Sequence, residues 1–185
     1  MEQKEYVVLV DERDSQIGLE EKLKAHELGL LHRAFSVFLF RKKDNKIELL
    51  LQQRAKHKYH CGGLWANTCC SHPRDGEPVI KAGKRRLQEE MGIKDVSLEP
   101  VGKFAYKAVF ENGLTEHEID HVLIGHFDSD DINFNPEEVQ AVRWVTLDQL
   151  EKELIEKPEI FVPWLAKALR KAQGMSLKVV GKIDE

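Results

Sequence analysis

The N-terminal part of the chain alternates between hydrophobic runs and polar turns. Residues 5–10, 34–40 and 47–53 are rich in β-branched, aromatic and aliphatic side chains. Runs of this length and composition predict strands, and the polar connection 43–46 predicts a hairpin between the last two. The polar stretch 11–18 ends in glycine and predicts a turn.

The middle of the chain combines a long loop with a helix. Residues 54–77 show no hydrophobic period and contain three glycines and a proline. A loop of this length in a compact domain is usually functional. Residues 78–91 predict a helix with an apolar stripe, because Pro78 suits the first turn and Gly92 suits the residue just past the end.

The remaining pattern predicts more strands, followed by two helices. Strands are predicted at 96–109, 118–127 and 139–145, and helices at 147–156 and 161–172. Thr146 begins a capping box for the first helix, and Gly174 suits the end of the second. Strands in the middle with helices around them predict an α/β or α+β domain with a mixed sheet.

Composition narrows the class of protein. The 185 residues suit a single domain over 1–185, with 42% hydrophobic residues to form a core. A net charge of −4 argues against a nucleic-acid partner, and no apolar window is long enough for a membrane span. The N-terminus lacks a signal-peptide pattern, and three cysteines, two of them adjacent, indicate free thiols in a reducing compartment. We therefore expect a cytoplasmic monomer.

The candidate chemistry begins in the long loop. Cys70 stands two residues before His72, and the helix that follows carries Glu89 and Glu90 close to two arginines. A thiol, metal-ligand types and an acidic helix indicate a metal-dependent enzyme for a charged, phosphorylated small molecule. The charge pattern alone also fits a solvated helix face with pairs four residues apart.

The spacing of this helix resembles the Nudix box, which reads Gly, five residues, Glu, seven residues, Arg-Glu-aliphatic, one residue, Glu-Glu, one residue, Gly-aliphatic. The matching positions are Glu77, Arg85, Leu87, Glu89, Glu90, Gly92 and Ile93. Ser71 stands in place of the glycine, and Arg86 in place of a glutamate that helps bind the hydrolytic metal. Arginine offers no lone pair to a metal, so this departure argues against ordinary Nudix hydrolysis.

The eight histidines divide into two groups. Three stand beside other candidate groups and, with Glu116 and Glu118, suit Zn²⁺, Mn²⁺ or Fe²⁺; they are His26, His32 and His72. The two glutamates alternate along an extended strand and so point to one face, although alone they would be interpreted as solvent-facing residues. The others are interpreted as ordinary surface or core residues: His57, His60, His117, His121 and His126.

Basic residues flank the same loop. Lys22, Arg54, Lys58 and Arg86 are singly ordinary surface charges, but together they could neutralise a diphosphate. Ser71 could add a hydroxyl donor.

Together these motifs resemble the type I isopentenyl-diphosphate Δ-isomerases, a Nudix-fold family, over nearly the whole chain. The matching pieces are Lys22 to His26, 31–36, 53–58, 65–73, 85–92, 104–106, 116–118 and 163–164. Arginine at position 86 is what this family, unlike Nudix hydrolases, would show. The chain departs from the family at 60–63, His-Cys-Gly-Gly, where an aromatic-Pro-Gly sequence is usual. Glycine in place of proline is expected to loosen this loop.

The resemblance implies an α+β Nudix fold, with a central mixed sheet flanked by helices. We also expect the N-terminal segment, 1–33, to close over the active site, because Lys22 and His26 would otherwise be held far from the loop. The resemblance implies a site for Mn²⁺, Mg²⁺ or Zn²⁺ formed by His26, His32, His72, Glu116 and Glu118. Glu90 would help to hold a second ion, Mg²⁺, that bridges to the diphosphate. The phosphates would be contacted by Lys22, Arg54, Lys58, Ser71 and Arg86.

The implied reaction interconverts the small molecules isopentenyl diphosphate and dimethylallyl diphosphate through a tertiary carbocation. Cys70 and Glu118 would exchange protons on opposite faces of the isoprene unit, with Tyr106 beside Glu118 and Trp164 lining the pocket. Such a cation needs a dry pocket and is stabilised by an aromatic face. The sequence leaves open which of Cys70 and Glu118 donates the proton. Two alternatives are a Nudix-type pyrophosphohydrolase and a non-catalytic module that senses a metal or nucleotide.

Overall fold

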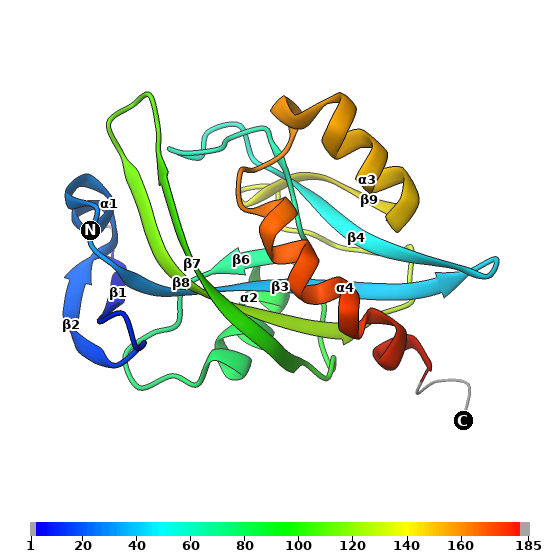
Figure 1. Ribbon diagram of the computed structural model, residues 1–185, viewed down its shortest axis with the longest axis horizontal. Helices are drawn as coiled ribbons and strands as arrows, with labels where there is room; N and C mark the ends of the chain where they lie inside the picture. The colour runs from blue at the N-terminus through cyan, green and yellow to red at the C-terminus, as the bar shows by residue number, and fades with distance from the viewer. Residues whose placement is uncertain (1–2, 182–185) are drawn as a thin grey trace.

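A computed structural model describes the backbone of residues 3–181 and the side chains of residues 3–174. Within this range the chain forms a nine-stranded mixed sheet with helices packed against it (Figure 1). The elements are β1 (Tyr6–Val10), β2 (Gln16–Glu21), α1 (Lys22–Leu28), β3 (His32–Lys43), β4 (Lys46–Arg54), β5 (Trp65–Ala66), β6 (Cys69–Ser71), α2 (Val79–Met91), β7 (Glu99–Val109), β8 (Thr115–His126), β9 (Val139–Thr146), α3 (Leu147–Glu156), the 3₁₀ helix η1 (Pro158–Ile160) and α4 (Leu165–Gly181). The predicted α+β class with a mixed sheet is confirmed.

Strand β3 is the centre of the sheet. Strand β8 runs parallel to it along residues 32–40, while β1, β6 and β4 pair with it antiparallel at successive positions. The run Ala34–Phe40, apolar except for Ser36, fits this position, because a strand covered on both faces needs hydrophobic residues on both.

The two faces of the sheet carry separate hydrophobic cores. On β3, Phe35, Val37 and Leu39 join a core that includes residues of α2, whereas Phe38 and Phe40 join a core that includes residues of α4. This alternation follows the two-residue period of a strand. Figure 1 shows α4 in front of β3 and α2 behind it.

Polar residues interrupt the apolar pattern on the α4 side of the sheet. In the parallel register of β3 and β8, His32 lies opposite Glu118, and Ser36 lies further along β3 on the same face. Strand β6 places Cys70 opposite Ser36 from the other edge of β3. The topology therefore gathers a thiol, an imidazole and a carboxylate from three strands.

Local sequence signals explain how the elements begin and end. Asp44 and Asn45 both have positive φ, as a tight hairpin turn requires, and confirm the turn predicted at 43–46. Gly92 ends α2 in a left-handed conformation, with its amide donating to Gln88 O and the next amide to Leu87 O. Thr146 Oγ1 accepts a hydrogen bond from Gln149 N and caps α3. These predicted boundaries are confirmed.

Other predictions need correction. The stretch predicted as a turn over 11–18 includes the start of β2, and neither β2 nor α1 was predicted. Strand β2 is a sheet edge with Ile17 and Leu19 exposed, and α1 has only seven residues, too few for a clear helical period. Helix α4 continues past Gly174 to residue 181, since an exposed glycine weakens a helix without ending it.

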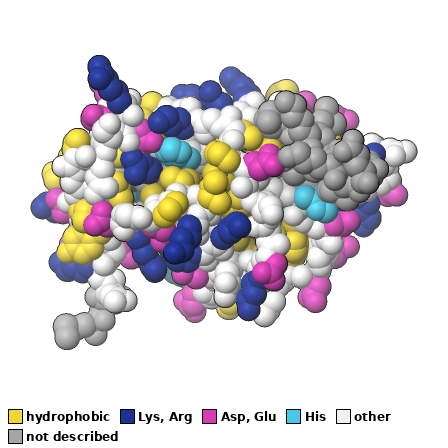
Figure 2. All heavy atoms as spheres, turned by 90° about the horizontal axis from the view of Figure 1, so that it is seen from below, with side chains coloured by type: hydrophobic (Ala, Val, Ile, Leu, Met, Phe, Trp, Pro, Cys, Tyr) yellow, Lys and Arg dark blue, Asp and Glu magenta, His cyan; other side chains and the backbone are white. Residues whose placement is uncertain are grey.

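Within residues 3–181, we find no helix that combines the length and apolarity required to cross a membrane. On the face shown in Figure 2, basic and acidic side chains are interspersed and form no continuous basic stripe.

Candidate active site

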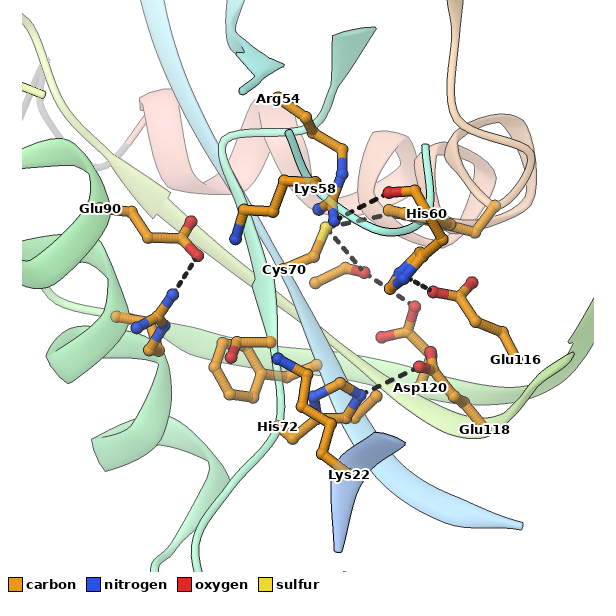
Figure 3. A pocket seen from close by; sticks show the side chains of 16 residues that line it. Lys22, Arg54, Lys58, His60, Cys70, His72, Glu90, Glu116, Glu118 and Asp120 are labelled. Carbon is orange, nitrogen blue, oxygen red and sulfur yellow. Dashed lines mark hydrogen bonds and ion pairs between the residues drawn. The ribbon is translucent and has the colours of Figure 1, made fainter. Parts of the chain in front are cut away.

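One pocket on the α4 side of the sheet collects most of the residues that the sequence predicted. Its lining consists of Lys22, Ala34, Phe35, Ser36, Arg54, Lys58, His60, Cys70, Ser71, His72, Arg86, Glu90, Glu116, Glu118, Asp120 and Trp164 (Figure 3). Of the predicted site residues, only His26, His32 and Tyr106 are absent from this lining. His26 and His32 are fully buried next to it.

Four predicted metal ligands converge at one end of the pocket. Ligand atoms of His26, His32, His72 and Glu118 all lie within 4.8 Å of one another. His72 Nε2 lies 3.1 Å from Glu118 Oε1, and His32 Nε2 lies 3.4 Å from the same oxygen. His26 comes from α1, His32 from β3 and Glu118 from β8. His72 directly follows β6, the strand that carries Cys70.

The backbone orients two of these imidazoles for metal binding. His26 Nδ1–H donates to Lys22 O across 2.6 Å, and His32 Nδ1–H donates to Leu30 O across 2.8 Å. A proton on Nδ1 leaves the lone pair of Nε2 for a metal ion. His26 Nε2 is buried and finds no hydrogen-bond partner among the described residues. This donor set and orphaned nitrogen fit a divalent cation.

Burial keeps two of the imidazoles uncharged. It lowers the pKa of His26 to about 4 and that of His72 to about 3. Burial also acts to raise the pKa of Glu118, but hydrogen bonds from His32 and His72 outweigh it and hold that pKa well below the ordinary value. Neutral His26 and His72 beside an ionised Glu118 are the protonation states that metal ligation needs. Burial acts to lower the pKa of His32, but its contact with Glu118 outweighs this and raises the pKa, so His32 would have to release its Nε2 proton when a cation binds.

Glu116, the fifth predicted ligand, lines the pocket but lies outside this four-residue group. Its Oε1 lies 2.6 Å from His60 Nε2, and its Oε2 is buried without a hydrogen-bond partner in the part of the chain that the structure describes. His60, which was interpreted from the sequence as an ordinary surface or core residue, lines the pocket with its imidazole. Its role was hidden because the sequence does not reveal how the loop around it folds.

The predicted catalytic thiol is held by an amide that sequence reasoning missed. Cys70 Sγ–H donates to Asn67 Oδ1 across 2.9 Å, and Trp164 Nε1–H donates to the same oxygen across 3.2 Å. The Asn67 amide nitrogen donates to Val37 O and Cys69 O, which determines the orientation of the side chain. Burial raises the pKa of the Cys70 thiol, so it is neutral near pH 7.

Two further polar residues beside Cys70 were also missed. Ser36 Oγ donates to Asp120 Oδ2 across 2.8 Å and lies 3.8 Å from Cys70 Sγ. Burial and the charge of Glu118 raise the pKa of Asp120 well above its ordinary value. Asp120 continues the alternation of Glu116 and Glu118 along β8, which is the signal that could have revealed it.

Tyr106 lies opposite Glu118 in the antiparallel register of β7 and β8, as predicted. Its ring meets that of Trp164 edge-on at 6.3 Å between centroids. The hydroxyl is buried and has no hydrogen-bond partner within the described residues, and burial raises its pKa.

The predicted phosphate-binding residues line the same pocket, and several pair with carboxylates. Lys22 Nζ contacts Glu5 Oε2 at 2.8 Å. Lys58 Nζ bonds to Glu138 Oε2, whose other oxygen lies 3.3 Å from Arg86 Nη2. These carboxylates hold three of the cationic side chains that line the pocket.

Arg85 and Arg86 form ion pairs with carboxylates on α2 and with Glu77, which lies just before this helix. Arg85 contacts both oxygens of Glu77, at 3.0 to 3.1 Å, and also Glu89 Oε2. Arg86 donates to Glu89 Oε2 and to Glu90 Oε1. The other oxygen of Glu90 accepts from two further groups, Gln52 Nε2 and Cys69 Sγ.

Comparison with known proteins places this arrangement in a family. The NUDIX domain family matches residues 30–165. An isopentenyl-diphosphate Delta-isomerase of Photobacterium profundum is 51% identical over 167 residues, which cover 90% of this chain and 93% of that protein. Isopentenyl-diphosphate Delta-isomerase 2 of Aromatoleum aromaticum is 47% identical over 163 residues, covering 88% of this chain and 84% of that protein.

A solved structure supports the fold independently. The crystal structure of DR0079 from Deinococcus radiodurans superposes with a TM-score of 0.72 at 20% identity, covering 90% of this chain and 98% of that one. At this identity the likeness concerns the fold alone. From the domain match and the identity of about half over most of its length, the chain belongs to the isopentenyl-diphosphate Delta-isomerases within the NUDIX domain family.

Proposed function

We propose that this protein interconverts isopentenyl diphosphate and dimethylallyl diphosphate by moving a double bond. The observation that carries the proposal is that one pocket combines Cys70 and Glu118 with a set of cationic side chains suited to a diphosphate. Its relatives named as isopentenyl-diphosphate Delta-isomerases support the same substrate.

The diphosphate would lie against the basic side chains of the pocket. Arg54 and Arg86 offer planar guanidinium groups for bidentate contacts, whereas Lys22 and Lys58 offer point charges. Ser71 adds a hydroxyl donor. Clamping the diphosphate orients the small alkene, so that binding energy from a non-reacting group contributes to the chemical step.

A divalent ion, Mn²⁺, Mg²⁺ or Zn²⁺, would be held by His26, His32, His72 and Glu118, with Glu116 as the fifth ligand. The inward-facing Nε2 atoms and the orphaned nitrogen of His26 support this assignment. When bound, such an ion supplies positive charge that tunes the proton affinity of Glu118. Glu90 would hold a Mg²⁺ ion beside the diphosphate by exchanging one of its protein contacts.

Cys70 and Glu118 would exchange protons with the alkene: one donates a proton to it, and the other accepts a proton from it. The two residues come from β6 and β8, on opposite edges of β3, so an alkene between them meets one group on each side. One of the two groups donates a proton to the terminal carbon, which produces a tertiary cation at the adjacent carbon. The other group accepts a proton from the methylene carbon on the far side of the cation, and the new double bond forms there. The thiol is suited to this site because a neutral thiol is buried more easily than a carboxylate.

Trp164 would protect the cation, while Tyr106, opposite Glu118, would tune the proton affinity of that carboxylate. The Trp164 ring lines the pocket and is nearly fully buried, so it excludes water and presents a π face. Cation–π attraction in such a desolvated place is worth about 2 kcal/mol. Excluding water prevents capture of the cation as an alcohol.

Nudix-type hydrolysis is less well supported. Arg86 stands where that chemistry has a metal-binding glutamate, and a guanidinium group offers no lone pair to a metal. A non-catalytic sensing module would bind metal without converting any diphosphate. The cytoplasmic location, the monomeric state and the absence of nucleic-acid and membrane partners stay predictions from the sequence.

Cys70→Ala tests the proposal, with Cys61→Ala as the matched control. Cys61 lies in the same loop but outside the pocket lining. We expect Cys70→Ala to abolish conversion of isopentenyl diphosphate and Cys61→Ala to retain it. Full turnover by Cys70→Ala would overturn the proposed chemistry.

A further inference from the structure

We infer that His60 is a positioning residue that holds one oxygen of Glu116 and thereby presents the other oxygen to the metal ion. This role rests on the metal site proposed above. It concerns the sequence His60-Cys61-Gly62-Gly63, where the chain departs from the family pattern.

The contact between the two side chains is short and buried. His60 Nε2 lies 2.6 Å from Glu116 Oε1, and the side chains are only 8% and 4% exposed. Glu116 Oε2 finds no partner within the described residues, so the carboxylate is anchored through one oxygen and free at the other. A buried carboxylate oxygen without a donor is costly unless something binds it.

Glu116 is placed to deliver that free oxygen to the metal ligands. It stands two residues before Glu118 on β8, so both side chains project to the same face of the sheet. His60 also stacks on the ring of His26, at 5.5 Å between centroids and 28° between planes. The imidazole of His60 therefore contacts two residues of the proposed metal site at once.

The loop conformation that brings His60 there depends on Gly62. A Cβ at this position would lie 2.5 Å from Lys56 O and 3.0 Å from Lys58 O, closer than real side chains approach a carbonyl. Cys61 and Gly63 both have positive φ, and Gly63 N donates to Arg54 O. The glycine therefore allows a compact turn that points His60 inward, and the expected loosening of the loop stays a prediction.

The neighbouring hairpin supports the same loop. Asn112 Nδ2 donates to Tyr59 O across 2.7 Å, and the Phe110 ring lies 5.7 Å from the ring of His60. Both residues come from the connection between β7 and β8, the strand that carries Glu116. The loop, the hairpin and the ligand strand thus hold His60 in one orientation.

Hydrogen bonds to metal-ligating carboxylates orient the ligand, and loss of such partners typically weakens metal affinity by about 10–100-fold. We therefore expect His60→Ala to weaken binding of Mn²⁺ to the metal-free protein by about this factor. His60→Gln keeps an N–H donor of similar reach and should recover part of the loss. His57→Ala is the matched control, because His57 lies in the same loop with its side chain 63% exposed.

The experiment is a calorimetric titration of metal-free protein with Mn²⁺ alone, at constant neutral pH, for the wild type and each variant. The titration is repeated for Glu116→Gln with and without His60→Ala, which tests whether His60 acts through Glu116. We expect His60→Ala to have little further effect there, whereas a merely structural role would persist. Thermal unfolding of each variant confirms that the titrated protein is folded.

If the wild type binds Mn²⁺ and His60→Ala binds it equally well, the role of His60 is overturned but the metal site is not. Equal weakening by His60→Ala in both backgrounds would also overturn it, because the effect would not pass through Glu116. A wild-type protein that binds no Mn²⁺ would overturn the proposed metal site and this role together.

Discussion

The thiol of Cys70 and the indole of Trp164 share one hydrogen-bond acceptor, Oδ1 of Asn67, at 2.9 and 3.2 Å. Cys70 and Asn67 are three residues apart in the loop, whereas Trp164 is 97 residues further along the chain. One buried amide therefore sets the relative position of a predicted proton donor or acceptor and the aromatic face beside it. The proposed chemistry needs the thiol and the indole beside the same carbon atoms of the substrate.

Asn67→Ala should lower the turnover number much more than it changes KM. The variant removes the acceptor of both hydrogen bonds, so the thiol and the indole can adopt other orientations. Misplacement of reacting groups by about 1 Å can cost about 100-fold in rate. Steady-state kinetics with isopentenyl diphosphate measures the effect, and the infrared S–H stretching band of Cys70, identified by its absence in Cys70→Ala, reports the lost hydrogen bond.

Thr68→Val is the control for general damage to this loop. Thr68 is fully buried, donates to Leu50 O and accepts from Leu39 N, and its hydroxyl holds neither Cys70 nor Trp164 by a hydrogen bond. We expect this variant to lose stability while its S–H band stays at the wild-type frequency. An equal fall in turnover for both variants would show that Asn67 has only a structural role.

Arg86→Lys should weaken substrate binding without introducing hydrolysis. A lysine keeps the charge but cannot reproduce the contacts of Arg86 with Glu89, Glu90 and a diphosphate. Hydrogen bonds between charged groups are worth about 1.5–3 kcal/mol, so KM should rise by about tenfold or more. Arg143→Lys, which alters an ion pair with Glu153 outside the pocket, should leave KM unchanged.

Both kinetics and phosphate release should be measured for Arg86→Lys. An unchanged KM would contradict the assignment of this residue to the diphosphate. Release of phosphate by the wild type would show instead that the acidic helix retains hydrolytic chemistry.

Asp14 should make a pH-dependent contribution to stability. Its carboxylate contacts Arg33 at 2.8 Å, His121 at 2.7 Å and Lys103 at 3.1 Å, and so ties the β1–β2 turn to three strands. Burial acts to raise the pKa of Asp14, but these partners outweigh it and lower the pKa below 3.8. The contribution is therefore complete above the unfolded-state pKa and is lost as the pH falls through the lower folded-state pKa.

Asp14→Asn isolates this charge, because asparagine also tolerates the positive φ of residue 14. We expect the free energy of unfolding in urea to fall by about 1–3 kcal/mol at pH 7. The difference from the wild type should shrink at pH 3 and below. A difference that is the same at both pH values would mean that shape rather than charge matters at this turn.

Gly92→Ala and Gly174→Ala should have opposite effects on stability. At position 92, which has φ of +66°, a Cβ would lie against the carbonyl oxygen of Asn133. The conformation and the overpacking together should destabilise the protein by about 2 kcal/mol or more. At position 174, inside α4, a Cβ meets no described atom within 4 Å, and alanine should stabilise by about 0.5–1 kcal/mol. Chemical denaturation of both variants measures these changes.

A destabilised Gly174→Ala would contradict the continuation of α4 through this residue, and a neutral Gly92→Ala would contradict the observed end of α2. The comparison also separates two glycines that the sequence pattern treats alike. Both were predicted to stop a helix, but only Gly92 has the left-handed conformation that a stop requires.

Residues recognisable by type and spacing could be predicted from the sequence, and the structure brings most of them to one pocket. The alternation of Glu116 and Glu118 and the Cys70–His72 spacing are local features, so their geometry follows from the strand and loop that carry them. The central strands were predictable for a similar reason, since a run buried on both faces is unmistakably apolar.

Residues that depend on distant packing could not be predicted. Asn67 resembles any loop asparagine until Trp164 and Cys70 are brought to it by the fold. His60 faces the pocket only because Gly62 fits beneath two carbonyl groups, and no local pattern reveals that contact. Strand β2 and helix α1 are too short for periodicity to identify them.

The most direct measurement follows the reaction by NMR in D₂O. Protein, isopentenyl diphosphate, Mg²⁺ and Mn²⁺ are incubated together, the metal is then removed, and proton and phosphorus spectra are recorded. We expect dimethylallyl diphosphate with deuterium in the methyl group, because deuterons from the solvent reach the substrate through Cys70 or Glu118. We expect no free phosphate, because the diphosphate stays intact. Free phosphate without a shifted double bond would contradict isomerisation, and a shifted double bond without deuterium would contradict proton exchange through these two residues.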